Sequence, residues 1–365
     1  MRKITLVCAA LFAAMAASAE VTFTVEKLWE SSENLPAVTG SRQGVGHDGK
    51  VLVQDKGSKT IWAFAKEGDA ITRTEFVKND DLDAVGIAID NAGNLVVLNG
   101  WAGSNPSAAV IIKNADKTCK KITFTLPKAE GATVIGRTDY VFASGDLFSE
   151  EGGIIYMYPQ NQKAIYGIKV INGEVTEVNP IGSGWNAGNT ASTIIVDAYG
   201  NLIAQARSAE WQKWNVATSK LESVTFGGDI KKACVGGCAL QLAGKDLVAY
   251  NVGTENYNSE WTLFNITDNV KVCAESLYIV DKAGAGSTAV ANWLTAQKID
   301  ENTYYIYQYC PNKGVGIWKV TAKDVPTDTE ETPIAAPQPK KIMHNGQVVI
   351  VRDNKMYNMM GVEIN

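Results

Sequence analysis

The feature that most constrains this chain is a short unit that recurs along it: a strand, a tight turn, and a second strand. The clearest copy spans residues 86–97 and turns at Asp90-Asn91-Ala92-Gly93-Asn94. A second copy spans residues 192–204, and a shorter one spans residues 44–53. Glycine supplies the positive φ that such turns need, and Asp or Asn caps the turn with its side chain. Each copy therefore predicts a β-hairpin.

The hairpin unit repeats with a period. Weaker copies occur at residues 144–147, 242–247 and 300–304, and successive copies are 44 to 57 residues apart. Periods of roughly 40–50 residues with four strands each are typical of β-propeller blades. Over residues 20–323, six blades would have about 51 residues each, whereas seven would have about 43, fewer than every observed spacing. We predict an all-β fold, a β-propeller of six blades.

The ends of the repeat region predict how the ring closes. The last blade offers three strands, ending near residues 316–320, after which the sequence becomes polar. Residues 21–29 form an orphan strand that precedes the first hairpin. Pairing the two removes an exposed sheet edge that would favour aggregation. We therefore expect the N-terminal strand to complete the last blade.

The first 19 residues have the pattern of a cleavable signal peptide. Arg2 and Lys3 precede an uncharged apolar run over residues 4–16, and Ala17-Ser18-Ala19 provides a small-x-small cleavage site. The run is shorter than the roughly 20 residues that a membrane span needs. We expect an exported protein, located in the periplasm, at the cell surface or outside the cell.

Charge and hydropathy disfavour several classes of partner. Without residues 1–19 the net charge is about −7, and no cluster of Lys and Arg occurs. Nucleic acid and anionic membrane surfaces are therefore not expected as partners. No later segment is long and apolar enough to insert into a membrane, and nothing indicates an oligomeric state.

An odd number of cysteines follows the signal peptide, so at least one has no partner within the chain. These are Cys119, Cys234, Cys238, Cys273 and Cys310. A local bridge between Cys234 and Cys238 and buried free thiols both remain open.

The C-terminal part differs from the repeats. Residues 324–340 are rich in Pro, acidic and small polar residues, which predicts a linker. In residues 341–365, two short apolar stretches flank Asp353-Asn354-Lys355, which predicts a small β segment.

Two parts of the sequence resemble known families. Residues 341–365, with Asn345-Gly346 and Arg352-Asp353-x-Lys355-x-Tyr357, resemble short C-terminal segments of exported Bacteroidetes proteins and a shortened type IX secretion sorting domain. The resemblance implies a sorting signal, and a strand pair that packs on the propeller is the alternative. The hairpin at residues 86–95 resembles those of NHL-like extracellular propellers. That resemblance implies architecture and no particular chemistry.

Aromatic and polar residues gather in the segments that follow second strands and that join blades, which share one face of a propeller. Trp rings stack on the apolar C–H faces of sugars, and amides and carboxylates bind hydroxyls. We therefore predict an extracellular glycan or peptide as partner, bound by Trp101, Asn105, Trp185, Asn186, Asn189, Arg207, Glu210, Trp211 and Tyr257. The alternative for each Trp is packing in the channel or between blades, the role we assign to Trp62, Trp214, Trp261, Trp293 and Trp318.

Two other functions stay open. The first is an enzyme, a metal-dependent lactonase-like hydrolase. Six-bladed propellers of that kind bind a divalent cation, such as calcium, through inward Glu, Asn and Asp side chains, which would make Asp139, Asn189 and Glu210 candidate ligands. No spacing singles these residues out, so we predict no catalytic residue, metal site or cofactor. His47 and His344 are the only histidines, which disfavours a zinc site and a Ser-His-Asp triad. A structural or adhesive scaffold is the third possibility.

Overall fold

The structure is a computed structural model that describes most of the chain after the predicted signal peptide. The described residues are 21–37, 39–99, 107–127, 137–138, 140–188, 192–206, 209–224, 226, 236–252, 259–280, 292–323, 340–344, 347–352, 355–357 and 363–364. The chain divides into two compact units, one of Phe23–Lys323 and one of Met1–Thr22 with Asp324–Asn365. Over the described ranges every regular element is a β-strand, and no helix there could span a membrane.

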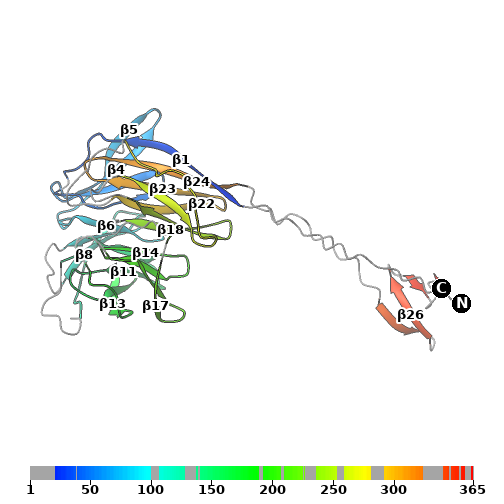
Figure 1. Ribbon diagram of the computed structural model, residues 1–365. Coiled ribbons are helices and arrows are strands. Elements are labelled where there is room, and N and C mark those ends of the chain that lie inside the picture. Colours follow the sequence, from blue (N-terminus) through cyan, green and yellow to red (C-terminus); the bar gives the residue numbers. More distant parts are fainter. Residues whose placement is uncertain are drawn as a thin grey trace. The chain divides into compact units, whose positions relative to one another are not determined.

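The first unit is a ring of six four-stranded antiparallel sheets (Figure 1), which confirms the predicted six-bladed propeller. Blade 1 holds β2 (Gly44–His47), β3 (Lys50–Asp55), β4 (Thr60–Glu67) and β5 (Ala70–Lys78); blade 2 holds β6 (Gly86–Ile89), β7 (Leu95–Asn99), β8 (Ser107–Ile112) and β9 (Cys119–Phe124); blade 3 holds β10 (Phe142–Gly145), β11 (Gly153–Met157), β12 (Ile165–Ile171) and β13 (Glu174–Ile181). Blade 4 holds β14 (Thr193–Val196), β15 (Leu202–Gln205), β16 (Gln212–Asn215) and β17 (Lys220–Ser223); blade 5 holds β18 (Gly237–Leu242), β19 (Lys245–Asn251), β20 (Trp261–Asn265) and β21 (Val270–Lys271). Blade 6 holds β22 (Trp293–Asp300), β23 (Thr303–Cys310), β24 (Gly314–Lys323) and β1 (Thr22–Ser31).

The first strands of the blades surround the propeller axis. They contact one another in the cyclic order β2, β6, β10, β14, β18, β22 and back to β2. Blades 3 and 6 therefore lie on opposite sides of the central channel. A tight turn connects the first strand to the second in five of the blades, and residues 146–152 make this connection in blade 3, so all six connections share one face of the ring. We call it the turn face.

The N-terminal strand closes the ring, as the sequence predicts. The sheet order of blade 6 is β1-β24-β23-β22, so β1 covers what would otherwise be an open edge (Figure 1). Blade 6 in turn packs tightly on blade 1, where Gly44 lies against Tyr309 and Gly46 against Tyr307. An ideal Cβ on Gly44 would fall 2.6 Å from the side chain of Tyr309, so the contact requires glycine.

The turn chemistry expected from the repeat is present in blades 2 and 4. Oδ1 of Asp90 accepts hydrogen bonds from the backbone N–H groups of Ala92 at 2.9 Å and Asn94 at 2.8 Å. Oδ1 of Asp197 accepts the same pair of bonds, from Tyr199 and Asn201, both at 2.9 Å. The glycine between them has a φ of 83° in blade 2 and 79° in blade 4. The two turns are therefore structural copies of each other.

Apolar side chains fill the spaces between neighbouring blades. Between blades 2 and 3, for example, the fully buried core includes Val96, Ile111, Ile155 and Ile168. Burying such side chains stabilises the fold by about 1.5–3 kcal/mol each. Among the tryptophans assigned to packing, Trp261, Trp293 and Trp318 are buried, as expected, and Trp62 and Trp214 are half-buried.

The cysteines that the structure describes carry free thiols: Cys119, Cys238, Cys273 and Cys310. Cys234 lies outside the described residues. Burial raises the pKa of the Cys310 thiol to about 12 and also raises that of Cys238, so both stay protonated at neutral pH.

The described part of the second unit is a small antiparallel sheet. Its strands are β25 (Lys340–His344), β26 (Gln347–Arg352), β27 (Lys355–Tyr357) and β28 (Glu363–Ile364), in that order. The strands fall in the segment for which the sequence predicts β structure.

Candidate functional site: the central channel

A cavity of about 480 Å³ lies in the centre of the propeller. It is lined by residues of the first strands of all six blades and by Gln43, just before β2. A volume in this range is typical of small-molecule sites. The site is therefore built from segments far apart in the sequence, and blades 2 and 4 add residues of their turns.

One end of the cavity is closed by aromatic rings from opposite blades. The ring of Trp293, the first residue of β22, lies 4.5 Å from that of Tyr140 and 5.9 Å from that of Phe142, centre to centre. Because Trp293 belongs to blade 6 and the other two to blade 3, the contact crosses the channel. It does so at the end where the first strands begin.

Gln43 reinforces this closed end. Its side-chain Nε2 donates to the carbonyl of Val141 at 2.8 Å, and its Oε1 accepts from the N–H groups of Val141 and Ile87 at 3.2 Å each. One buried amide thus joins the starts of the first strands of blades 1, 2 and 3. Buried side-chain networks of this kind fix backbone positions because breaking them leaves polar groups unpaired.

The other end of the cavity opens on the turn face. Among the lining residues there, Asn91 and Ala198 are exposed and Ser144 is half-buried, whereas Val141 and Trp293 at the closed end are buried. We call the lining residues at the turns the rim.

The charged groups that line the cavity are carboxylates. Asp90 and Asp197 lie at the rim, and no Lys or Arg is found among the lining residues that the structure describes. Burial raises the pKa of Asp90, against the hydrogen bonds from Leu147, Asn94 and Ala92 that lower it. Oδ2 of Asp90 accepts from the N–H of Leu147 in blade 3 at 2.9 Å, so this carboxylate also joins two blades.

The rim also carries hydrogen-bonding groups that the fold uses only in part. Oδ1 of Asn91 accepts from the N–H of Gly145 at 2.7 Å, and its Nδ2 has no partner within the described ranges. The hydroxyls of Ser144 and Tyr156 lie 3.0 Å apart and share one hydrogen bond. These groups can bind a ligand hydroxyl as donor or acceptor.

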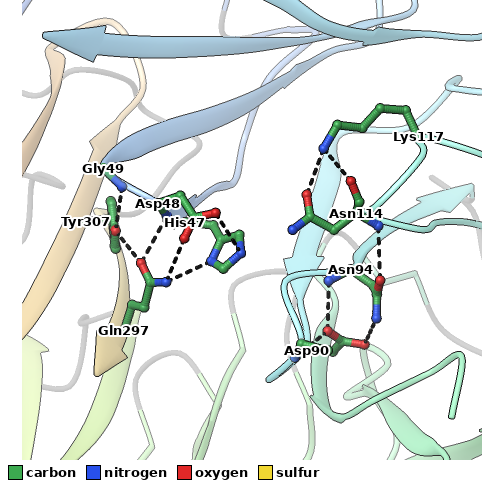
Figure 2. Close-up of polar contacts among 10 residues, drawn as sticks. His47, Asp48, Gly49, Asp90, Asn94, Asn114, Lys117, Gln297 and Tyr307 are labelled. Atoms are coloured by element: carbon green, nitrogen blue, oxygen red, sulfur yellow. Dashed lines mark hydrogen bonds and ion pairs between the residues drawn. The ribbon is translucent and has the colours of Figure 1, made fainter. Parts of the chain in front are cut away.

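A hydrogen-bonded cluster joins blades 6 and 1 on the turn face (Figure 2). Oε1 of Gln297 accepts from the N–H of Asp48 at 3.0 Å and from the hydroxyl of Tyr307 at 2.5 Å. Its Nε2 therefore points to Nδ1 of His47, 3.0 Å away, and donates to it. His47 is thus an acceptor at Nδ1, and it lies beside the Asp48-Gly49 turn where blades 6 and 1 meet.

Figure 2 also shows the hydrogen bonds that connect the turn of blade 2, at Asp90 and Asn94, to the loop between β8 and β9 of the same blade. Asn94 donates from Nδ2 to Asp90 at 2.9 Å and accepts at Oδ1 from the N–H of Asn114 at 3.0 Å. Lys117 donates to Oδ1 of Asn114 at 2.7 Å. These hydrogen bonds connect the rim residues of blade 2 to the hairpin of β8 and β9, so the two parts of the blade support each other.

Two of the three tryptophans predicted to bind a glycan, Trp185 and Trp211, are buried packing residues in this structure. Trp185 and Trp211 are each 1% exposed. The indole N–H of Trp185 donates to the carbonyl of Ile181 at 2.7 Å, and its ring lies edge-on to Tyr158. Trp211 lies edge-on to Phe226. Neither ring face is open to a sugar here, which agrees with the alternative of packing between blades.

The other predicted site residues are partly described. Nδ2 of the half-buried Asn186 donates to the backbone carbonyl of Glu210 at 3.3 Å, and Glu210 is exposed. Trp101, Asn105, Asn189, Arg207 and Tyr257 lie outside the described residues, as does the candidate calcium ligand Asp139. In the part of the chain that the structure covers, no three His, Cys, Asp or Glu side chains are grouped to hold a metal ion.

The residues of the channel were not predicted from the sequence. Phe142 was not singled out, and Trp293 was assigned to packing alone, although it also lines the cavity. Tyr199, beside the rim, lies in the second copy of the hairpin and was not singled out either. The signal that could have found Tyr199 is the difference between the two copies of that turn, because the equivalent position in blade 2 is Ala92.

Comparisons with known proteins identify no family. No protein-family model matches the sequence, and no curated protein matches it. Among solved structures, a protein of unknown function from Dyadobacter fermentans is similar at 11% identity and a TM-score of 0.48, covering 82% of this chain and 99% of that one. The PQQ-bound aldose sugar dehydrogenase from Streptomyces coelicolor is similar at 10% identity and a TM-score of 0.46, covering 84% of this chain and 100% of that one. At these values neither neighbour assigns an activity to this chain.

Proposed function

We propose that this chain is an exported binding protein that takes the end of a neutral extracellular glycan into the central channel from the turn face. The observation that carries the proposal is the cavity itself, which has aromatic rings at its closed end and hydroxyl, amide and carboxylate groups at its rim. Export is supported by the signal-peptide pattern of residues 1–19 and by the resemblance of residues 341–365 to sorting segments.

The cavity has apolar and polar lining residues, and a sugar likewise has apolar C–H faces and polar hydroxyls. The half-buried ring of Phe142 lines the cavity and offers apolar surface for C–H groups, while Trp293 is buried and packs against it. Nδ2 of Asn91 and the hydroxyl of Ser144 offer hydrogen bonds at the rim. Sites of this composition, mostly apolar with a few placed polar groups, are typical of small-molecule recognition.

The charge of the lining favours a neutral ligand. Asp197 pairs with Lys213 at 3.5 Å, so the carboxylate of Asp90 is the lining charge that would repel a phosphate, sulfate or uronic acid, and no Lys or Arg is among the described lining residues to attract one. Carboxylates are good acceptors for sugar hydroxyls. An extended peptide is the less favoured occupant because the cavity is closed at one end by the contact of Trp293 with Tyr140.

A glycan array that contains neutral and acidic glycans tests the proposal with the purified full-length protein. Two variants add the same bulky side chain to one blade: Ala198→Trp at the rim and Ala217→Trp in the exposed turn between β16 and β17. We expect signal on neutral glycans, at least tenfold weaker with Ala198→Trp and unchanged with Ala217→Trp. No signal, or equal loss with both variants, would contradict the proposal.

The array also separates the alternatives. Binding that disappears with EDTA and returns with calcium would favour the lactonase-like alternative. Binding that depends on Trp101 rather than on the rim would favour the loop residues of the original prediction.

A further inference from the structure

Tyr199 lies at the edge of the cavity and is unusually exposed. Its side chain is 60% exposed, and its chain neighbours Ala198 and Gly200 both line the cavity. A large aromatic residue in this position presents apolar surface to solvent next to the opening of the channel.

The turn itself does not require an aromatic residue at this position. In blade 2 the equivalent residue is Ala92, whose N–H donates to Asp90 at 2.9 Å, as that of Tyr199 does to Asp197. Both turns use only the backbone of this residue. The phenol ring of Tyr199 therefore makes no contribution to the turn that Ala could not make.

The hydroxyl of Tyr199 accepts a hydrogen bond from a residue of the next blade. Nε2 of Gln241, on β18 of blade 5, donates to the hydroxyl of Tyr199 at 3.0 Å, and it also lies 3.3 Å from Oδ1 of Asp246. The ring thus reaches from blade 4 to blade 5 along the rim. A side chain that is already ordered loses less conformational entropy when a ligand binds to it.

We infer that Tyr199 forms an outer subsite that stacks on the second sugar unit of a chain whose terminal unit occupies the channel. This inference rests on the proposed function and makes it narrower: the ligand is a neutral oligosaccharide, bound end-on, rather than a free monosaccharide. The ring supplies the apolar face that the sugar ring needs, and no cation lies among the described groups bonded to it.

Isothermal titration calorimetry with sugars of increasing length tests the inference. The probes are glucose, galactose, mannose and xylose and their α- and β-linked disaccharides and tetrasaccharides. We expect the full-length protein to bind a tetrasaccharide about tenfold more tightly than its monosaccharide. Tyr199→Ala should remove this preference and leave monosaccharide affinity unchanged, whereas Tyr199→Phe should keep most of it.

The matched control is Val216→Ala, which removes another exposed apolar side chain from blade 4. It should leave affinities for every probe unchanged. The melting temperature of Tyr199→Ala should equal that of the unmodified protein, because Ala92 occupies the same turn position in blade 2.

The outcomes separate the two proposals. Sugar binding with the same preference for length in Tyr199→Ala would overturn the outer subsite and leave the channel site standing. No binding of any sugar by the unmodified protein would overturn both.

Discussion

An ideal Cβ atom on Gly46 would lie 1.7 Å from Cγ of Tyr307. This contact brings the first strand of blade 1 against the second strand of blade 6, where the ring closes. The same tyrosine donates to Gln297 and accepts from the N–H of Gly49 at 3.0 Å. The two ends of the propeller are therefore joined by a contact that depends on the absence of one side chain.

Gly46→Ala should destabilise the protein by about 3 kcal/mol or more, because the added methyl forces the ring of Tyr307 and its strand away from blade 1. Gly49→Ala is the control, since its Cβ would meet nothing within 4 Å and the positive φ of 72° costs about 1 kcal/mol. Urea unfolding measures the free energy of unfolding of both variants. Equal losses of stability in the two variants would show that the close approach of Gly46 to Tyr307 is not the cause.

Alkaline pH should weaken the same closure. Burial raises the pKa of Tyr307 from 10 to about 12. The unfolded chain loses this proton near pH 10 and the folded chain near pH 12, so the stability that Tyr307 contributes is complete below pH 10 and is lost as pH rises to 12. Each unit in that window lowers the free energy of unfolding by about 1.4 kcal/mol. Urea midpoints between pH 8 and 11 should fall less steeply for Tyr307→Phe than for the unmodified protein; parallel slopes would refute this.

Asp90→Asn should cost more stability than Asp197→Asn, by about 1–3 kcal/mol. Both substitutions place an N–H₂ group against the side-chain amide of the turn asparagine, Asn94 or Asn201. Only Asp90 also accepts from Leu147 of the next blade, and that N–H would then face a second donor. Thermal unfolding of the two variants measures the difference, and a larger loss for Asp197→Asn would contradict the role of Asp90 between blades.

Trp185→Ala should destabilise the fold by about 3–5 kcal/mol, because it removes a buried ring and its hydrogen bond to Ile181. Where the variant is still folded, its glycan binding should equal that of the unmodified protein. A stable variant with lost binding would instead support the stacking role predicted from the sequence. Val270→Ala, at an exposed position, serves as the control for stability.

The fold could be predicted because its signals are local and repeated. The turns at Asp90 and Asp197 encode their own hydrogen bonds within five residues, and six hairpins spaced 44 to 57 residues apart suffice to give a blade count. Ring closure was also predictable, since the orphan strand and the incomplete last blade each indicated a missing partner.

The site could not be predicted in the same way, because it depends on packing between segments that are distant in sequence. Whether Trp185 faces solvent or the core is decided by how its segment folds over Tyr158, which no local pattern specifies. The closed end of the channel needs Trp293 and Tyr140 from opposite blades. Tyr199 could have been found from the sequence. Aligning its turn with the copy that holds Ala92 shows that the turn does not need a large side chain at this position.

The pairing of β1 with β24 also has a consequence for folding. β1 is the first propeller strand to be synthesised and β24 the last, so this pairing has the longest sequence separation in the ring and the greatest entropic cost of loop closure. A fragment that stops before Gly314 leaves both β1 and β23 with unpaired edges, so losing one strand exposes two. We therefore expect the propeller to close late in folding, once the whole of β24 is available to pair with β1.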